Sequence, residues 1–236
     1  MSAYYLISDE NTPGCGFSSY ELGGFFDEIV GPDGKPRQAA RPLMDRLGRL
    51  TDEELLQRQR AAERALLHMG ITFQVYSDTT GQEKIFPFDV IPRVIDAQEW
   101  KRVEAGLKQR IHALNLFIDD IYHDQRILKE GVIPREIIAS AKSYRAVCAG
   151  LNPPRGVWCH ITGTDLVRDR DGTLYVLEDN LRCPSGVSYV LENRRVMKNT
   201  FPSVFDSTHI RPVSDYPGRL LDTLQYLAPD TDHAPQ

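Results

Sequence analysis

Residues 163–182 read Gly163-Thr164-Asp165-Leu166-Val167-Arg168-Asp169-Arg170-Asp171-Gly172-Thr173-Leu174-Tyr175-Val176-Leu177-Glu178-Asp179-Asn180-Leu181-Arg182. An Asp-Gly pair between two apolar-patterned segments predicts a β-hairpin with a two-residue type I′ turn, because that turn needs positive φ at both central positions. In this register Arg170 faces Thr173, and counting outward along both strands places Asp165 opposite Glu178. A four-residue loop gives the same pairing, whereas a three-residue loop would displace it.

The predicted register brings three oxygen-bearing side chains to one face of the hairpin. Asp165 and Glu178 face each other there, and Asn180 shares the face because it follows Glu178 by two residues, whereas Asp179 points the other way. Facing carboxylates repel, and a divalent cation between them would turn the repulsion into coordination. Two carboxylates and an amide oxygen suit Mg²⁺. A solvated acidic rim that binds no metal fits the same spacing, so both interpretations stay open.

The residues after the hairpin offer groups for binding anions. Arg182 follows Asn180 by two positions, so its guanidinium could lie beside a metal and a transferring phosphoryl group or an oxyanion. The Pro-Ser-Gly loop behind it could hold a substrate carboxylate through Ser185, Gly186 and Ser188. A plain connecting loop is the alternative for these three residues.

Helix and strand signals extend over the rest of the chain. The Thr51–Glu54 capping box predicts a helix to about Met69, ended by Gly70. Residues 71–76 read as a strand, residues 77–82 as a turn and residues 84–90 as an irregular return strand. A long amphipathic helix follows Asp96, with its core-facing stripe at Trp100, Val103, Leu107, Ile111, Leu114, Ile118 and Ile121.

A shorter helix is predicted from Pro134, strands over residues 157–161 and 173–178, and a last helix over residues 217–227. Helices and antiparallel hairpins mix without regular βαβ alternation, so the expected fold class is α+β. We expect a glycine- and proline-rich N-terminal segment over residues 1–50 that packs on a main domain over residues 51–228. Residues 229–236 read as a polar tail or linker.

Composition excludes several classes of protein. The 236 residues carry a formal net charge of −5, without the basic surplus that is typical of nucleic-acid binders. No stretch approaches the ~18 consecutive apolar residues of a membrane span, and the start lacks the pattern of a signal peptide, so we expect a cytoplasmic protein. The four cysteines form no C-x-x-C pair, which favours free thiols over a zinc or redox site.

Other polar residues have weaker signals. On the long helix, Asp119 and His123 share one face, as do Asp120 and Asp124, which fits an acid–base dyad or substrate contact as well as a charged helix end. Arg93, Lys108 and Arg110 could reach a substrate carboxylate or remain on a solvated face. His160 and Cys159 point to opposite faces of the predicted strand, so a joint metal site is not expected.

The Asp165, Glu178 and Asn180 pattern, followed by the Pro-Ser-Gly loop, resembles the magnesium-binding end of the ATP-grasp ligases. A resemblance over nearly the whole chain, to the circularly permuted ATP-grasp (type 2) proteins related to glutathionylspermidine synthetase, is carried by residues 40–43, 70–76, 85–93, 115–124 and 176–193. It implies a partial permuted ATP-grasp fold in which Asp165, Glu178 and Asn180 bind Mg²⁺ and Arg182 lies near the reacting phosphate. Some members with a similar hairpin carry arginine where this chain has Gly163, so an oxyanion role must be filled from elsewhere.

The resemblance implies an ATP- and Mg²⁺-dependent ligase that joins a carboxylate and an amine through an acyl phosphate. The chain resembles only the N-terminal half of such proteins, and it lacks the lysines and glycine-rich lid expected to hold ATP. Residues 51–228 would then be the metal-binding part of the domain. Two alternatives remain: a non-catalytic module that needs a separate ATP-binding polypeptide, and a metal-dependent phosphohydrolase that uses the same carboxylates.

Overall fold

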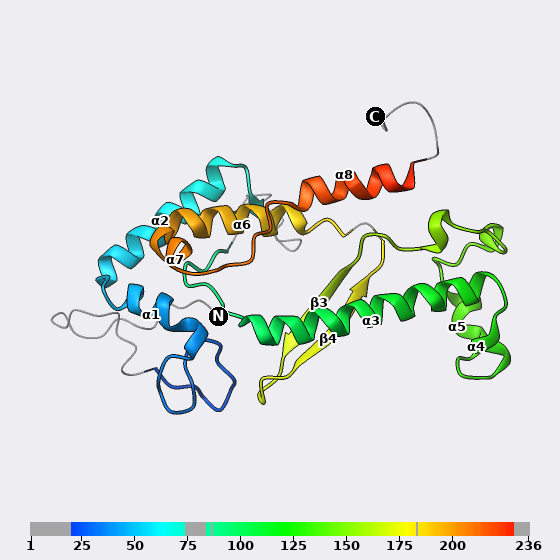
Figure 1. The fold of residues 1–236 in the computed structure, drawn as a ribbon, viewed down its shortest axis with the longest axis horizontal. Coiled ribbons are helices and arrows are strands. Elements are labelled where there is room, and N and C mark those ends of the chain that lie inside the picture. Colours follow the sequence, from blue (N-terminus) through cyan, green and yellow to red (C-terminus); the bar gives the residue numbers. More distant parts are fainter. Residues whose placement is uncertain (1–19, 74–83, 86, 183, 229–236) are drawn as a thin grey trace. The chain divides into compact units, whose positions relative to one another are not determined.

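The structure is a computed structural model that describes residues 20–73, 84–85, 87–182 and 184–228. In these residues the fold consists of helices and two small antiparallel sheets, so the predicted α+β class is confirmed (Figure 1). In chain order the elements are η2 (Gln38–Ala40), α1 (Arg41–Leu47), α2 (Asp52–His68), β1 (Thr72–Phe73), β2 (Lys84–Ile85), α3 (Ala97–Tyr122), α4 (Arg126–Lys129), α5 (Arg135–Ser140), η3 (Ala146–Cys148), η4 (Pro154–Gly156), β3 (Gly163–Arg168), β4 (Leu174–Asn180), α6 (Val187–Thr200), α7 (Pro202–Ser207) and α8 (Tyr216–Leu227).

The chain divides into two compact units. One contains residues up to 96 together with 168–173 and 186–214, and the other contains residues 97–167, 174–185 and those from 215 onward. The predicted boundaries after residues 50 and 228 stay predictions. None of the helices in the described ranges is long and apolar enough to cross a bilayer.

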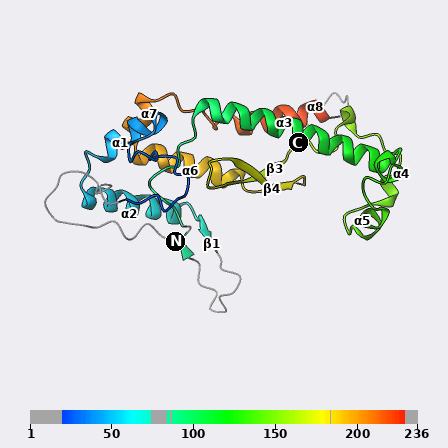
Figure 2. The ribbon, with the colours of Figure 1, turned by 90° about the horizontal axis from the view of Figure 1, so that it is seen from below.

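In the first unit, helices pack in two pairs around apolar side chains. The α2 helix lies beside α6 (Figure 2). The buried side chains between them are Ala62, Leu66 and Val196. The α1 helix packs on α7, where the buried cluster consists of Leu43, Leu47, Leu50, Val90, Phe201 and Val204. Burial of such aliphatic and aromatic side chains supplies the main favourable free energy of folding.

The start of α2 confirms the predicted capping box. The Glu54 amide donates to Thr51 Oγ1 at 3.2 Å, and the Thr51 amide donates to Glu54 Oε2 at 2.8 Å. The helix ends at His68, and Gly70 follows with a φ of +71°, a left-handed conformation that favours glycine. The prediction for this helix was therefore correct at both ends.

The first predicted hairpin is only partly described. β1 pairs antiparallel with β2, with Thr72 opposite Ile85 and Phe73 opposite Lys84. The predicted strand over residues 71–76 and the turn over 77–82 fall mostly outside the described residues, as does residue 86. The predicted return strand is too long at its end, because residues 87–90 are not part of β2, and Pro87 lacks the N–H that a ladder needs.

In the second unit the long helix α3 begins at Ala97, directly after Asp96 as predicted, and ends at Tyr122. Its apolar stripe is half-buried or buried, as expected. The helices predicted from Pro134 and over residues 217–227 are also present, as α5 and α8. The predicted strand over residues 157–161 is wrong. Asn115 Oδ1 on α3 accepts from the amides of Trp158 and Cys159, both at 2.9 Å, so a side chain takes the place of a strand partner.

Candidate functional site

The turn of the β3–β4 hairpin differs from the predicted one. The Gly172 amide donates to the Asp169 carbonyl at 3.0 Å, and the Asp169 amide donates to the Thr173 carbonyl at 2.9 Å. This pattern encloses three residues, with Gly172 at a φ of +88°, whereas Asp171 has no positive φ. The turn is therefore a type I turn followed by a glycine bulge, and the predicted type I′ turn is wrong.

A three-residue loop alone would shift the strand register by one residue. At the far end of the hairpin, however, Thr164 Oγ1 donates to Asp179 Oδ1 at 2.9 Å, a cross-strand pair that belongs to the predicted register. Between the turn and this pair, β4 has one residue more than β3. Leu177 and Glu178 are consecutive and both exposed, which indicates that the extra residue is a β-bulge there.

Beyond the bulge, the structure brings together Asp165, Glu178 and Asn180. The Asn180 amide nitrogen Nδ2 donates to Asp165 Oδ2 at 3.3 Å and to Glu178 Oε1 at 3.1 Å. All three side chains are exposed. We call these three residues the ligand face. On it, the positive end of an amide dipole lies within reach of two carboxylates.

The ligand face fits a divalent cation by its donor set. The side-chain N–H of Asn180 already offsets part of the repulsion between the two carboxylates. If this side-chain amide rotates, its oxygen takes the place of its nitrogen. Two carboxylates and an amide oxygen then form a hard, all-oxygen set that suits Mg²⁺ and leaves positions open for water or phosphate. Within the described ranges no group of three or more His, Cys, Asp or Glu residues could hold a metal ion. The ligand face is not such a group, because its third donor is the amide of Asn180.

The opposite face of the same strands carries Asp179, whose side chain is only 8% exposed. Besides the hydrogen bond from Thr164, it accepts from Arg110 Nε of α3 at 2.7 Å (Oδ2). Sequence reasoning predicted that Asp179 points away from the ligands, but it missed this partner. Arg110 is separated from Asp179 by 69 residues in the sequence, and no local pattern signals such a pair.

Arg182, the predicted catalytic residue, lies two residues after β4 and is exposed. It has no hydrogen bond or ion pair with another described residue, so its guanidinium is available to an anionic ligand. Gly163, at the start of β3, has a packing reason to be glycine: a Cβ there would lie 2.9 Å from Cβ of Pro184. The close approach of Pro184 therefore leaves no room for a side chain at position 163, two residues before Asp165.

The predicted carboxylate-binding loop leads into a helix. Gly186 is the N-cap of α6, and Ser185 and Ser188 are exposed on either side of it. The first amides of a helix lack partners within the helix and favour negative charge. A substrate role for Ser185, Gly186 and Ser188 stays a prediction.

Arg93, another predicted substrate contact, is held by Glu28 in the first unit. Its Nε donates to Glu28 Oε2 at 2.7 Å and its Nη2 to Oε1 at 2.5 Å, while Arg168 Nε donates to Oε1 at 2.8 Å. Burial opposes ionisation of Glu28, but the two guanidinium groups outweigh it and lower the pKa of this carboxyl below its usual value. The substrate role of Arg93 stays a prediction, and here its guanidinium is engaged in a bidentate ion pair.

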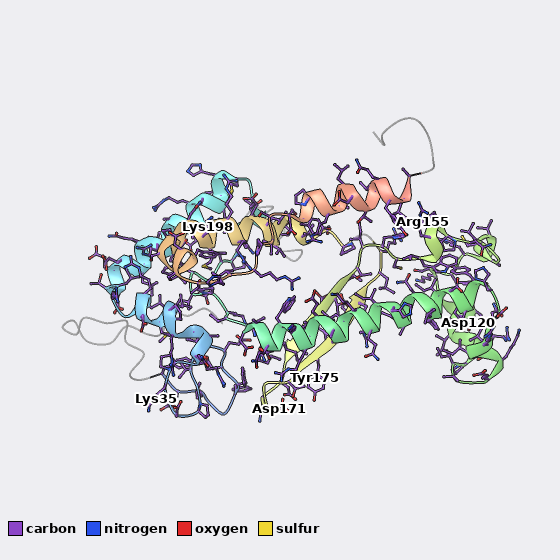
Figure 3. The ribbon with its side chains drawn as sticks, viewed as in Figure 1. Lys35, Asp120, Arg155, Asp171, Tyr175 and Lys198 are labelled. Carbon is purple, nitrogen blue, oxygen red and sulfur yellow. The ribbon has the colours of Figure 1, made fainter. Side chains whose placement is uncertain are left out.

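The charged end of α3 has mainly a structural explanation. Asp120 lies near the C-terminal end of α3 (Figure 3). It accepts from the amides of Ile127 and Arg126 at 3.0 and 2.9 Å, and these bonds lower the pKa of its carboxyl. Asp119 accepts from Trp158 Nε1 at 3.0 Å and lies 3.3 Å from His123 Nδ1. The bonds of Asp120 join the end of α3 to the first turn of α4, and the bond of Asp119 holds Trp158 against α3.

Two of the four cysteines, Cys148 and Cys159, lie in the described residues, and neither forms a disulfide. Burial raises the pKa of the Cys159 thiol, which disfavours the reactive thiolate. Cys15 and Cys183 lie outside the described residues.

Comparison with known proteins supplies a family. A family model described as circularly permuted ATP-grasp type 2 matches residues 92–236, a range that includes the whole ligand face. An uncharacterized protein of Synechocystis is 55% identical over 217 residues, which cover 92% of this chain and 45% of that protein. An uncharacterized protein of Mycobacterium leprae is 44% identical over 210 residues, covering 89% of this chain and 37% of that protein.

A Frankia alni protein that is provisionally named a glutamate–cysteine ligase is 36% identical over 211 residues, covering 89% of this chain and 24% of that protein. The chain thus spans less than half the length of each of these relatives. The family model matches more than half of the chain, and it includes β3, β4 and the loop into α6. The chain belongs to the circularly permuted ATP-grasp type 2 family.

Proposed function

We propose that this chain supplies the metal-binding part of an ATP- and Mg²⁺-dependent carboxylate–amine ligase. The observation that carries the proposal is the position of the Asn180 amide nitrogen, within hydrogen-bond distance of both Asp165 and Glu178. A donor between two carboxylates marks the place where a cation is favoured. Membership in the ATP-grasp family supports the same chemistry.

In the proposed reaction a substrate carboxylate attacks the γ-phosphorus of ATP, forming an acyl phosphate and releasing ADP. An amine then attacks the acyl carbon, an amide bond forms, and inorganic phosphate leaves with the electron pair of the C–O bond. Mg²⁺ bound by Asp165, Glu178 and Asn180 would screen the charge of the phosphate oxygens. Arg182, which has no hydrogen bond or ion pair with another described residue, would contact the transferring phosphoryl group.

The substrate carboxylate is assigned to the Pro-Ser-Gly loop. Ser185 and Ser188 provide hydroxyl donors, and the N-terminal end of α6 after Gly186 provides backbone N–H groups. Relatives provisionally named glutamate–cysteine ligases support an amino-acid-like acid and amine as the substrate class.

The metal assignment is tested by Glu178→Gln, which removes one anionic ligand and keeps the size of the side chain. We expect the affinity of the chain for Mg²⁺, measured by isothermal titration calorimetry, to fall at least about tenfold. Asp171→Asn is the matched control, because Asp171 is an exposed acid of the same hairpin that lies at the turn. Equal affinities of Glu178→Gln and the wild-type chain would refute the assigned role.

A second candidate is a non-catalytic part that works with a separate ATP-binding polypeptide. Titration of ATP with Mg²⁺ into the chain separates the two proposals: micromolar binding by the chain alone argues against a dependent part. Heat that appears only after a second polypeptide is added supports it. Phosphate release without any amine would instead favour a phosphohydrolase.

A further inference from the structure

The hydrogen bonds behind the ligand face involve the sequence neighbours of all three candidate ligands. Asp179 stands between Glu178 and Asn180, and Thr164 directly precedes Asp165. The bond from Thr164 Oγ1 to Asp179 Oδ1 therefore joins β3 to β4 on one face at the level where the ligands lie on the other. Arg110 of α3 holds the second oxygen of the same carboxylate.

A two-stranded sheet needs such support, because an isolated hairpin is marginally stable at best in water. Here the need is greater, since the bulge at Leu177–Glu178 interrupts the ladder next to the ligands. Near a β-bulge, the residues of β4 beyond it can pair with β3 in either of two registers that differ by one residue. The two registers place opposite sets of side chains toward the solvent. Only the pairing in which Asp179 lies on the same face as Thr164 places Glu178 and Asn180 on the same face as Asp165.

The Asp179 carboxylate is suited to fixing this choice. Its 8% exposed side chain receives one neutral hydrogen bond from a hydroxyl and one charge-assisted bond from a guanidinium. Turning it outward would break both bonds. Thr164 lies on β3, Asp179 on β4 and Arg110 on α3. The Asp179 carboxylate therefore links these three elements at one point.

We propose that Arg110, Asp179 and Thr164 are positioning residues that set the spacing of Asp165, Glu178 and Asn180 for a divalent cation. The inference rests on the proposed function of the ligand face and goes beyond it, because none of the three residues touches the ion. Groups that orient metal ligands from behind typically contribute 10–100-fold to metal affinity. The ligand face alone would supply the protein side chains that coordinate the ion.

The test uses Thr164→Val, which replaces one hydroxyl by a methyl group, keeps the β-branched shape and changes no charge. Thr164→Ser restores the hydroxyl, and Thr173→Val makes the same chemical change at the turn end of the hairpin. Isothermal titration of Mg²⁺ alone into each full chain measures the dissociation constant. Thermal melting by circular dichroism reports folding separately.

We expect the Mg²⁺ dissociation constant to rise about tenfold in Thr164→Val and to stay within about twofold of wild type in Thr164→Ser and Thr173→Val. Asp179→Asn, which cannot pair ionically with Arg110, should weaken binding by at least as much. A purely structural role predicts a lower melting temperature with unchanged ion affinity, and that result would overturn the proposal.

The same titrations distinguish failure of this inference from failure of the proposed function. If the wild-type chain binds Mg²⁺, Glu178→Gln does not, and Thr164→Val binds like wild type, the ligand face stands and the positioning role is refuted. If the wild-type chain binds no Mg²⁺, both are overturned. If Thr164→Val loses affinity and Thr164→Ser regains it, the positioning role is supported.

Discussion

Replacing Gly172 by alanine places a methyl group where the hairpin turn meets the N-terminal segment. An ideal Cβ on Gly172 would lie 2.5 Å from Cδ2 of Phe26, far inside the contact distance of two carbon atoms. The ring cannot easily give way, because the guanidinium groups of Arg37 and Arg168 lie 4.1 and 4.7 Å from its centroid. The backbone of Gly172 also has a φ of +88°, which an L-residue adopts only under strain.

Both effects contribute to the expected cost. The left-handed conformation costs a non-glycine residue roughly 1–2 kcal/mol. Inserting a methyl group into a filled space costs typically about 1–3 kcal/mol. We therefore expect Gly172→Ala to lower the free energy of unfolding by roughly 2–5 kcal/mol.

Urea unfolding followed by circular dichroism measures this cost, with Gly34→Ala as the control. Gly34 has a φ of +72° but no heavy atom within 4 Å of an added Cβ, so only the backbone cost applies, roughly 1–2 kcal/mol. In a Phe26→Leu background, which makes room beside the turn, Gly172→Ala should cost no more than Gly34→Ala does. If both alanine variants lose the same free energy in the wild-type background, the packing of Phe26 against the turn does not restrict the residue at position 172.

Three further predictions concern the first unit. Thr51→Ala removes the hydroxyl of the capping box and should lower the free energy of unfolding by about 1 kcal/mol, while Thr51→Ser should retain most of it in urea titrations. Leu66→Ala, at a fully buried position between α2 and α6, should cost about 2–5 kcal/mol by the same assay. The lowered pKa of Glu28 means that its ion pairs stabilise the fold above the unfolded-state pKa of about 4.5 and stop doing so as the pH falls below it. The difference in unfolding free energy between wild type and Glu28→Gln should therefore shrink between about pH 6 and pH 3, and a constant difference would contradict the role of the Arg168 and Arg93 pairs.

Local signals predicted the helices well. The capping box at Thr51 and the three-and-four spacing after Asp96 specify α2 and α3 through bonds and contacts within a few residues. The strand predicted over residues 157–161 failed for the opposite reason. Its apolar composition fits a strand, but the amides of Trp158 and Cys159 bond to Asn115, 43 and 44 residues away in the sequence. Such a partner leaves no periodic pattern in the sequence.

For the β3–β4 hairpin, the sequence predicted the position of the turn correctly and its type wrongly. Asp171-Gly172 marks the turn correctly, but the pair fits a type I′ turn and a type I turn with a glycine bulge equally well. The contact of Gly172 with Phe26 is compatible with the second, and it depends on a segment about 145 residues earlier in the chain. A sequence pattern can therefore place the turn without fixing its type or the strand register that follows from it.

The bulge explains how the ligand face forms although the turn type was wrongly predicted. A three-residue turn moves every pair by one position, which by itself would bring Asp165 opposite Leu177 and turn Glu178 toward the other face. One extra residue in β4 reverses that shift before the ligands are reached, and the contacts of Thr164 with Asp179 lie beyond it. The turn and the bulge are thus a compensating pair. Deletion of Leu177 should therefore remove the bulge, leave the turn intact and keep Glu178 opposite Asp165, so that Mg²⁺ binding in calorimetry is retained. Loss of Mg²⁺ binding in a variant that still folds would show that the bulge does not simply offset the turn.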